Sequence, residues 1–569
     1  MHPKTKKVTI VECSPGAMPA NAADLVESGR LTMSMDQSAH RFVAGDKFFN
    51  YQQYGALRSG GEVSLFSKNH CGLLVAAAHS AIVYALIRYC LRPTLMDSLQ
   101  LKRVENSAVI ECLISLPTSF SLFVGLLSDV FPIRGFHRKS YIILGCVVTF
   151  IMLGGLTALA LTINPTTTDQ EGIGDNLIYY MLLIMGTMLG TLISKIATDA
   201  RVIELSQREP LTSRGHLQIN YLIFRAICEC LASGVTAYLV HYDRSRKMFH
   251  LNVDMAWAFL ALAIFSLIPI PFVMFNCVEQ TVEQNEGEII ASLAASGISV
   301  NEQASLRSAG ARTRAFLRMC QQRAVWQIVL FLSLVLATTR FFFGSANSAL
   351  RALAQLDPNK SLVTSALRFI VNIVVMVGWK IWWSNSDWRR TMLTGLAVLV
   401  VAEVFRALMM LYVPSTRSQL FFDALLCVMS VSDGVISIFS FIPATEIAEF
   451  GSEGATIGLL QSFRSCLAVA MRTLSEKGMR QVATVHLTAG SSNLSMLCLL
   501  LMISYGVHAL SFFSVGLLPR QKLDAQQLRV YGGYSKIASG VLMAIFLVFF
   551  SFSTIVNLAA MVDMTKGSP

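Results

Sequence analysis

The sequence predicts an all-helical protein that crosses a membrane many times, built as two bundles of six helices with an additional helix near the C-terminal end. Of its 569 residues, 54% are hydrophobic and 14% are charged, whereas a soluble domain carries about 25% charged residues. Repeated apolar stretches reach the roughly 20 residues that cross the hydrocarbon core as a helix. Because only helices and closed barrels satisfy the backbone in lipid, these stretches predict a helical bundle.

Twelve apolar stretches are expected to span the membrane, and a thirteenth follows a short basic and polar link. The expected spans lie near 72–95, 107–128, 140–163, 177–199, 217–240, 256–278, 325–348, 361–383, 392–413, 419–443, 455–474 and 495–518, and the thirteenth lies near 537–562.

A long polar link separates the first six spans from the second six. We therefore expect a largely disordered N-terminal tail over 1–70 and a first bundle over 71–278. A central cytoplasmic loop is expected over 279–324, followed by a second bundle over 325–518 and a link with the extra helix over 519–569. The tail lacks an apolar stretch near its start, so no cleaved signal peptide is predicted.

Basic residues are concentrated in alternate links, which orients the spans by the positive-inside rule. The links after spans 2, 4, 6 and 8 are rich in arginine, and the link after span 3 has none. This pattern predicts a cytoplasmic N-terminus in a multi-pass protein, which we expect in the plasma membrane. The sequons at Asn359 and Asn493 then fall outside the cell, close to the membrane.

The two halves carry matching residues, as expected for an internal repeat. Gly215 begins a span that reaches Arg225 ten residues later, and Gly454 begins one that reaches Arg464 at the same spacing. A phenylalanine precedes each arginine and a cysteine follows closely. The cysteines show no metal-ligand spacing and are interpreted as small apolar packing residues.

The link between spans 2 and 3 places Asp129 shortly before Arg138 and Lys139. The aspartate at the end of a span can pair with Arg138 or with a neighbouring helix end, which would hold the cytoplasmic side closed until substrate binds. The alternative is a charged loop that sets the membrane orientation only.

Two arginines are expected near the middle of the membrane. Arg225 and Arg464 each lie ten residues, about 15 Å of helix, from the cytoplasmic start of their spans. A charge at this depth carries a penalty of roughly 2.5–3.5 kcal/mol and therefore marks a partner or a function. Both could bind a substrate carboxylate in a central cavity; the alternative for Arg225 is neutralisation by Glu229, one turn away.

Three further charges in the spans leave alternatives open. Lys195 and Asp199, four residues apart in span 4, either pair with each other or take part in gating. Asp433 in span 10 is a candidate for a carboxylate that binds and releases a proton, with a structural ion pair as the alternative.

Two more sets of charges point to pairing. Arg88 in span 1 either pairs with Glu111 near the outer end of span 2 or attracts anionic substrate. Glu403 and Arg406, three residues apart in span 9, are expected to form a self-contained structural pair.

Three segments resemble the folate-biopterin transporter family, a branch of the major facilitator type. The first is Gly125-Leu-Leu-Ser-Asp129 with the following loop through Tyr141. The second is Asp199-Ala-Arg-Val-Ile-Glu204 with Arg214-Gly-His-Leu-Gln218, and the third is Glu453-Gly-Ala-Thr456 with Gly458-Leu-Leu-Gln461-Ser462. The resemblance implies the major facilitator fold, with substrate contacts at Gln218 and Gln461 and gating at Glu204 and Glu453.

The resemblance implies a secondary active transporter of a folate, a pterin or a related small anion, working by alternating access, with proton symport among the mechanisms it allows. The chain departs from the family at Ser121-Leu122, where a Lys-Pro pair is usual, and at Lys195, where an acid is often found. These departures keep open a transporter of another small solute, and a receptor or scaffold that does not transport is a further alternative. The sequence predicts neither an enzyme nor a cofactor, metal or nucleic-acid site; its partners are the solute, protons and the lipid bilayer.

Overall fold

The computed structural model describes the greater part of the chain, namely residues 56–58, 60–98, 104–162, 173–243, 248–279, 281, 309–478 and 491–566. Most of the expected tail 1–70, most of the expected central loop 279–324 and the side chain of Asn493 lie outside the described residues. Twelve described helices are long and apolar enough to cross a membrane, or thirteen if one bent pair counts as a single span. The protein is therefore a multi-pass integral membrane protein.

The first six spans run from Cys71 to Asn276, and several are composites of consecutive helical segments. They are α2 (Cys71–Leu86) with η1 (Ile87–Leu91) and α3 (Arg92–Ser98); α4 (Val104–Ser115) with η2 (Leu116–Phe120) and α5 (Ser121–Val130); α6 (Lys139–Thr162); α7 (Ile173–Ser206); α8 (His216–Leu239); and α9 (Met255–Phe265) with α10 (Pro269–Asn276).

A two-stranded hairpin between α8 and α9 is a small addition to the predicted all-helical fold. Strands β1 (Val240–Asp243) and β2 (Met248–Leu251) pair antiparallel, with Val240 opposite Leu251.

The second half repeats the plan and ends in two further helices. Its elements are α13 (Ala309–Gln321); α14 (Arg323–Thr339) with α15 (Gly344–Leu353); α16 (Pro358–Gly378) with η4 (Trp379–Trp383); α17 (Trp388–Tyr412) and η5 (Pro414–Thr416); α18 (Gln419–Phe439) with α19 (Ile442–Ile447); α20 (Glu453–Thr473) with η6 (Leu474–Gly478); α21 (Ser491–Ala509), α22 (Ser511–Ser514) and η7 (Val515–Leu517); α23 (Lys522–Tyr531); and α24 (Lys536–Lys566).

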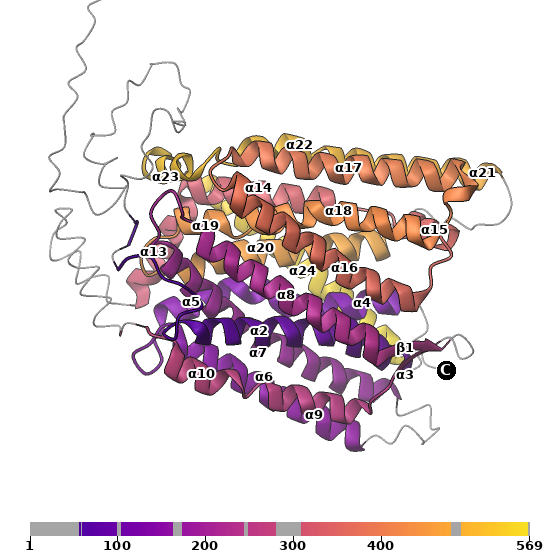
Figure 1. Ribbon diagram of the computed structural model, residues 1–569, viewed down its shortest axis with the longest axis horizontal. Helices are drawn as coiled ribbons and strands as arrows, with labels where there is room; N and C mark the ends of the chain where they lie inside the picture. The colour runs from indigo at the N-terminus through magenta and orange to yellow at the C-terminus, as the bar shows by residue number, and fades with distance from the viewer. Residues whose placement is uncertain are drawn as a thin grey trace, which may run out of the picture.

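The two halves lie side by side with their helices running along the long axis of the molecule (Figure 1). The helices from α2 to α10 lie on one side and those from α14 to α21 on the other. Helices α13 and α23 gather at one end, and α3, α15 and the β hairpin gather at the opposite end. We call these the Arg138 end and the Glu111 end, after the two ion-pair networks described below.

The seventh span is broken, which corrects the prediction of a continuous helix over 325–348. Helix α14 ends at Thr339, and α15 leaves it at an angle of 53°. The backbone N–H of Phe342 donates to the hydroxyl of Ser475, 3.2 Å away in η6, instead of continuing the helical ladder. A tertiary hydrogen bond has therefore replaced a helical one at this point.

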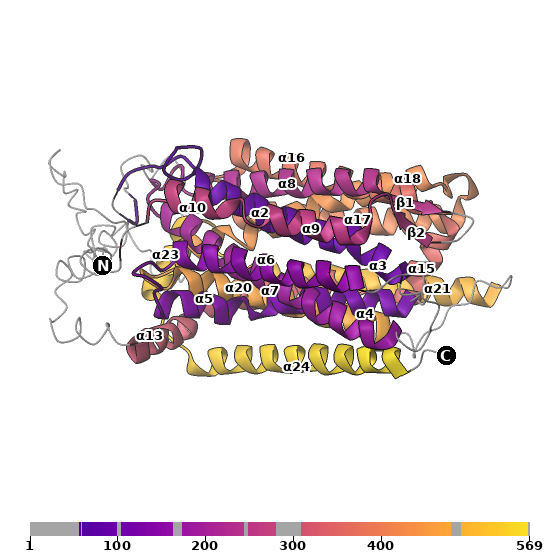
Figure 2. The ribbon, with the colours of Figure 1, turned by 90° about the horizontal axis from the view of Figure 1, so that it is seen from below.

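The thirteenth apolar stretch forms the helix α24, which lies along the edge of the bundle (Figure 2). It packs against α20 of the second half and against α4 and α7 of the first. Near the Glu111 end the side-chain amide of Asn557 donates to the hydroxyl of Thr473, at 2.8 Å. The extra helix thus bridges the seam between the two halves.

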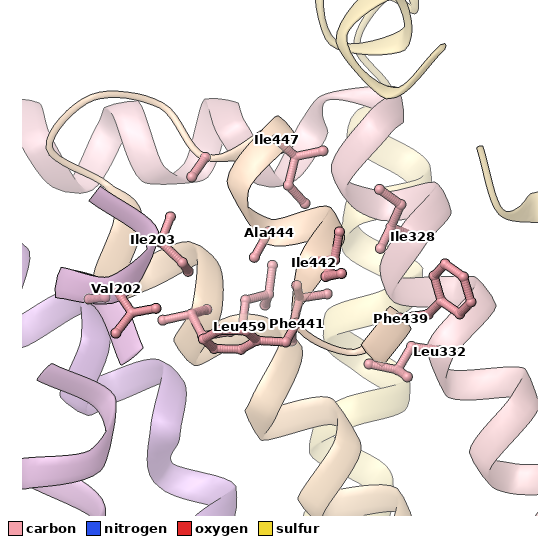
Figure 3. Close-up of a cluster of buried hydrophobic side chains, with 14 of the residues drawn as sticks. Val202, Ile203, Ile328, Leu332, Phe439, Phe441, Ile442, Ala444, Ile447 and Leu459 are labelled. Atoms are coloured by element: carbon pink, nitrogen blue, oxygen red, sulfur yellow. The ribbon is translucent and has the colours of Figure 1, made fainter. Parts of the chain in front are cut away.

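Apolar side chains close the seam between the cavity and the Arg138 end. The labelled side chains of this layer come from α7, α14, α18, the turn after α18, α19 and α20 (Figure 3): Val202, Ile203, Ile328, Leu332, Phe439, Phe441, Ile442, Ala444, Ile447 and Leu459. Since α7 belongs to the first half and the other helices to the second, this layer seals one half against the other.

Glycines allow α5 and α20 to approach until their backbones touch. A Cβ atom at Gly125 would stand 2.0 Å from the carbonyl oxygen of Gly454, and one at Gly458 would stand 2.5 Å from that of Ser121. Any side chain at these positions would push the two halves apart.

Candidate functional site

A polar cavity of about 260 Å³ lies between the two halves, in the middle of the bundle. Its lining comes from α2, α5, η2, α7 and α8 on one side and from α16, α18, the turn after α18, and α20 on the other. The lining residues that carry the argument are Tyr84, Lys195, Asp199, Arg225, Glu229, Phe369, Phe441, Gln461 and Arg464.

The first half contributes a linked row of charges to the cavity. Asp199 accepts hydrogen bonds from Lys195 at 2.8 Å and from the hydroxyl of Tyr221 at 2.6 Å. Arg225 lies 3.7 Å from Asp199 and 3.8 Å from Glu229. The pairing alternatives for Lys195 and for Arg225 are therefore both present, although each side chain also lines the cavity.

The second half contributes Arg464, whose surroundings differ from those of Arg225. Its guanidinium donates to the hydroxyl of Ser437 at 3.3 Å. Across the described residues it forms no ion pair, whereas Arg225 has two carboxylates within 4 Å. Arg464 thus presents to the cavity a guanidinium that lacks a carboxylate partner among the described residues.

Three of the residues predicted inside the spans, Gln218, Arg88 and Asp433, lie outside the lining of the cavity. The side-chain amide of Gln218 donates to the carbonyl oxygen of Phe441 at 3.3 Å and so supports the cavity wall. Arg88 pairs with Glu111 at 2.6 Å, which was one of its two alternatives.

Asp433 stands between Arg340 at 2.8 Å and Arg368 at 3.1 Å, so it has the structural ion pair left open by the sequence. Two cations therefore compensate the charge of this carboxylate.

At the Arg138 end, one buried arginine joins three carboxylates. Arg138 lies 2.6 Å from Asp129, 2.7 Å from Glu204 and 3.4 Å from Glu453. Burial alone would lower the pKa of Arg138, but the three carboxylates outweigh it and raise the pKa above its usual value. Because Glu453 belongs to α20, this network joins the first half to the second.

Asp129 also closes the seam through the backbone of α20. Its carboxylate accepts hydrogen bonds from the N–H of Gly454 at 3.2 Å and of Ala455 at 2.6 Å, at the N-terminal end of that helix. A carboxylate is favoured there by the helix dipole. The aspartate therefore makes both contacts proposed from the sequence, with Arg138 and with a neighbouring helix end.

Ser386-Asp387 precedes Arg389-Arg390 in the link after span 8, as Ser128-Asp129 precedes Arg138-Lys139 in the link after span 2. The contacts of the two aspartates differ, however, because Asp387 caps α17 by accepting from the N–H of Arg389 at 2.8 Å. Its pair with Arg390 is long, at 3.9 Å, and Arg390 is exposed. The matching sequence thus serves as a helix cap in the second half.

A second polar contact crosses the seam beside the Arg138 network. Arg214 lies 3.3 Å from Glu446, which also accepts a hydrogen bond from Gln526 of α23.

Glu209 accepts from the backbone N–H groups of Gly215 and Leu217 at 2.8 Å, so it caps the start of α8.

Glu209 should make the stability of the protein pH-dependent. Burial raises the pKa of Glu209 from 4.5 to about 7, despite its hydrogen bonds. Because the folded state then binds the proton more tightly, stability should fall as the pH rises from 4.5 to 7, by at most about 3 kcal/mol. Glu209→Gln should flatten this part of the profile in thermal unfolding between pH 5 and 8. Glu62→Gln, at an exposed glutamate, serves as the control; equal slopes in wild type and Glu209→Gln would contradict the assignment.

The predicted pair of Glu403 and Arg406 is wrong. Glu403 pairs with His508, and Arg406 lies over the ring of Phe422 with its carbon 5.0 Å from the ring centre. The three-residue spacing places both side chains on one face of α17. Each side chain nevertheless contacts a residue of another helix instead of the other member of the pair.

A larger groove, of about 680 Å³, lies on the surface between α5, α7 and α13. Apart from Thr313 its lining is apolar, and it includes the exposed side chains of Phe123 and Leu127. Such a surface suits lipid chains, so the smaller polar cavity is the better site for a charged solute.

Several charged residues of these networks were missed from the sequence. Glu279 accepts from the backbone N–H groups of His137, Arg138 and Lys139 and so holds the loop after span 2. Arg472 pairs with Glu111, which lies 361 positions away in the chain. A contact between helices this far apart produces no periodic pattern that would reveal it.

Comparison with known proteins agrees with this architecture. The chain matches the BT1 family over residues 82–530. It is 24% identical over 162 residues to Folate transporter 1 of Plasmodium falciparum, an alignment that covers 28% of this chain and 28% of that protein.

Solved structures of major facilitator transporters share the fold. The proton:xylose symporter XylE, bound to 6-bromo-6-deoxy-D-glucose, superposes with a TM-score of 0.55 at 12% identity and covers 84% of this chain and 98% of its own. The human organic anion transporter MFSD10 superposes with a TM-score of 0.51 at 12% identity, over 79% of this chain and 99% of its own. The molecule therefore has the major facilitator fold, with α24 as an additional helix.

Proposed function

Since the chain belongs to the BT1 family, the folate-biopterin transporters, and is a membrane transporter, we propose that it carries a folate, a pterin or a related small anion by alternating access. The cavity between the halves is the substrate site, with Arg464 as its principal anion-binding residue. The two ends of the bundle open in turn around it.

The observation that carries this proposal is the cationic character of the cavity. Lys195, Arg225 and Arg464 line it together with two acids, Asp199 and Glu229, which leaves one positive charge in surplus. A guanidinium without a carboxylate partner binds a substrate carboxylate in bidentate fashion. The anion would therefore restore neutrality in a region of low dielectric constant.

Aromatic and amide groups supply the remaining contacts. Tyr84, Phe369 and Phe441 offer rings on which a flat heteroaromatic group can stack, and Gln461 offers hydrogen bonds to its edge. A cavity of about 260 Å³ is near the lower limit for small-molecule sites. Its size favours a pterin over a whole folate in this conformation.

The gating part of the proposal assigns the Arg138 network to the cytoplasmic side, with the N-terminus in the cytoplasm and the protein in the plasma membrane. Asp129, Arg138, Glu204 and Glu453 would hold that side closed, and their separation would open it. Arginine-rich links at this end support the orientation.

Uptake of labelled folate and biopterin tests this function in transport-deficient cells that express the protein at a verified surface level. Saturable uptake that unlabelled pterins compete is the expected result. If the folded surface protein takes up neither compound, the pterin assignment fails. A small anion of another class, which the base at Lys195 favours, would then be the next candidate.

Proton coupling is assigned to Glu229 ahead of Asp433. Glu229 lines the cavity and lies 3.8 Å from Arg225, which is a long ion pair. Asp433, by contrast, pairs with two arginines at 2.8 Å and 3.1 Å. Glu229→Gln should therefore abolish accumulation driven by a pH gradient and leave exchange of internal for external substrate intact. Asp433→Asn is the comparison. Loss of gradient-driven accumulation in Asp433→Asn, with accumulation retained in Glu229→Gln, would return the role to Asp433.

A further inference from the structure

A second ion-pair network lies at the Glu111 end, where one buried carboxylate meets three arginines. Glu111 of α4 pairs with Arg88 of η1 at 2.6 Å, and it also pairs with Arg92 of α3 and with Arg472 of α20. Arg88 and Arg92 belong to span 1, whereas Arg472 belongs to span 11 in the other half. The network therefore joins the halves, as the Arg138 network does at the opposite end.

The charges of this network do not balance. Three guanidinium groups surround one carboxylate, and the neighbouring Arg351 and Glu476 contribute one charge of each sign. Two positive charges thus remain in surplus. At the Arg138 end, by contrast, Arg138, Arg58 and Arg201 face Asp129, Glu204 and Glu453, and Glu279 also lies close to Arg201. That network has no positive surplus.

Some N–H donors at the Glu111 end also lack an acceptor. Among the described residues, the buried Nε groups of Arg92 and Arg472 have no acceptor. The two oxygens of Glu111 already receive donors from all three arginines. An additional anion could accept from these remaining groups, because each guanidinium carries five donors.

The arginines are reachable, and one of them contacts a residue of the cavity lining. The side chains of Arg88 and Arg472 are 27% and 34% exposed, against 8% for Glu111. Arg88 also donates to the hydroxyl of Tyr84 at 2.6 Å, and Tyr84 lines the cavity. A single side chain therefore connects this network with the site proposed for the substrate.

All three spans of the network change their helical geometry close to its charged residues. The π-helical turn η1 contains Arg88, the 3₁₀ segment η2 starts five residues after Glu111, and the π-helical turn η6 starts two residues after Arg472. Such turns alter the direction of side chains within a helix and are frequent at functional sites. Their coincidence in three helices supports a role beyond ordinary packing.

We infer that the three arginines around Glu111 form a second anion-binding site, which takes a carboxylate ligand in exchange for the Glu111 side chain. Glu111 acts there as an internal competitor that occupies the site when no ligand is present. A bound carboxylate frees Glu111 and weakens the contact between Arg472 and span 2. That this ligand is the transported anion on its way to the cavity rests on the proposed function.

Removal of the internal competitor tests this inference without any measurement of transport. The probe is succinate, with uncharged succinamide as the chemical control, and binding is followed by thermal stabilisation of the full-length protein in nanodiscs at constant ionic strength. Glu111→Gln should bind succinate at least about tenfold more tightly than wild type, because the ligand no longer competes with a tethered carboxylate. Glu403→Gln, at a buried carboxylate on α17, should leave the affinity unchanged.

Two further variants separate this site from the central cavity and from a folding defect. Adding Arg472→Gln to Glu111→Gln should remove most of the gain, and Arg464→Gln should leave it intact. Should Glu111→Gln not fold, Arg92→Gln alone is expected to weaken succinate binding relative to wild type. Equal affinities in wild type and Glu111→Gln, or a gain that disappears with Arg464→Gln, would overturn the inference.

Discussion

Replacing Arg138 by glutamine should open the Arg138 end of the transporter. The substitution leaves Asp129, Glu204 and Glu453 close together, with only Arg58 and Arg201 to compensate their charges. Breaking a buried pair in this way costs about 3–5 kcal/mol. Since Glu453 lies in the other half, much of that repulsion is relieved when the halves separate at this end.

The opening can be measured by the reactivity of a cavity residue. A cysteine introduced at Ser465, which lines the cavity, is labelled with a membrane-impermeant maleimide from the Arg138 side. We expect Arg138→Gln to raise the labelling rate by about two orders of magnitude, as a shift of 3 kcal/mol implies. The same chain without the introduced cysteine gives the background from the native thiols.

The matched control is Arg134→Gln, because Arg134 is an exposed arginine in the same loop. It should leave the labelling rate close to that of wild type. If both variants label alike, or if Arg138→Gln labels no faster than wild type while remaining folded, the Arg138 network is not a gate.

Replacing Arg464 by glutamine should abolish most of the transport. The variant removes the one charged group that, within the described lining of the cavity, has no partner of opposite sign. A charge-assisted hydrogen bond contributes about 1.5–3 kcal/mol, so substrate affinity should fall roughly 10- to 100-fold. Arg464→Lys keeps the charge but loses the bidentate geometry and should give an intermediate value.

Arg406→Gln is the control, because it removes a buried arginine that does not line the cavity. Arg406 lies on α17 over Phe422, outside the lining of the cavity. Uptake per surface molecule should stay near the wild-type value in this variant. Equal losses in Arg406→Gln and Arg464→Gln would attribute the effect to folding.

Much of the fold could be predicted from the sequence because hydrophobic length is a local property. The expected spans correspond to helices of the structure, and the thirteenth stretch forms α24. The break in span 7 could not be predicted in this way, because it depends on Ser475 in a helix far along the chain. The β hairpin was missed because its short strands lie in a polar link.

Parts of the candidate site could be predicted because a charged side chain deep in the membrane carries an energetic penalty and therefore marks a partner or a function. Arg225 and Arg464 stand out in apolar spans, and the repeat brings both to the cavity. The partners were not predictable, since they are set by packing between distant helices. Arg472 with Glu111, and Arg340 with Asp433, are contacts of this kind.

Equilibrium binding of labelled folate and biopterin to the purified protein in nanodiscs tests the central claim most directly, because it needs neither a gradient nor a complete transport cycle. We expect saturable binding that unlabelled compound displaces, and an affinity at least tenfold lower in Arg464→Gln, whose melting temperature should stay close to that of wild type. Binding of equal affinity in wild type and in a folded Arg464→Gln protein would contradict the assignment of Arg464 to the substrate site.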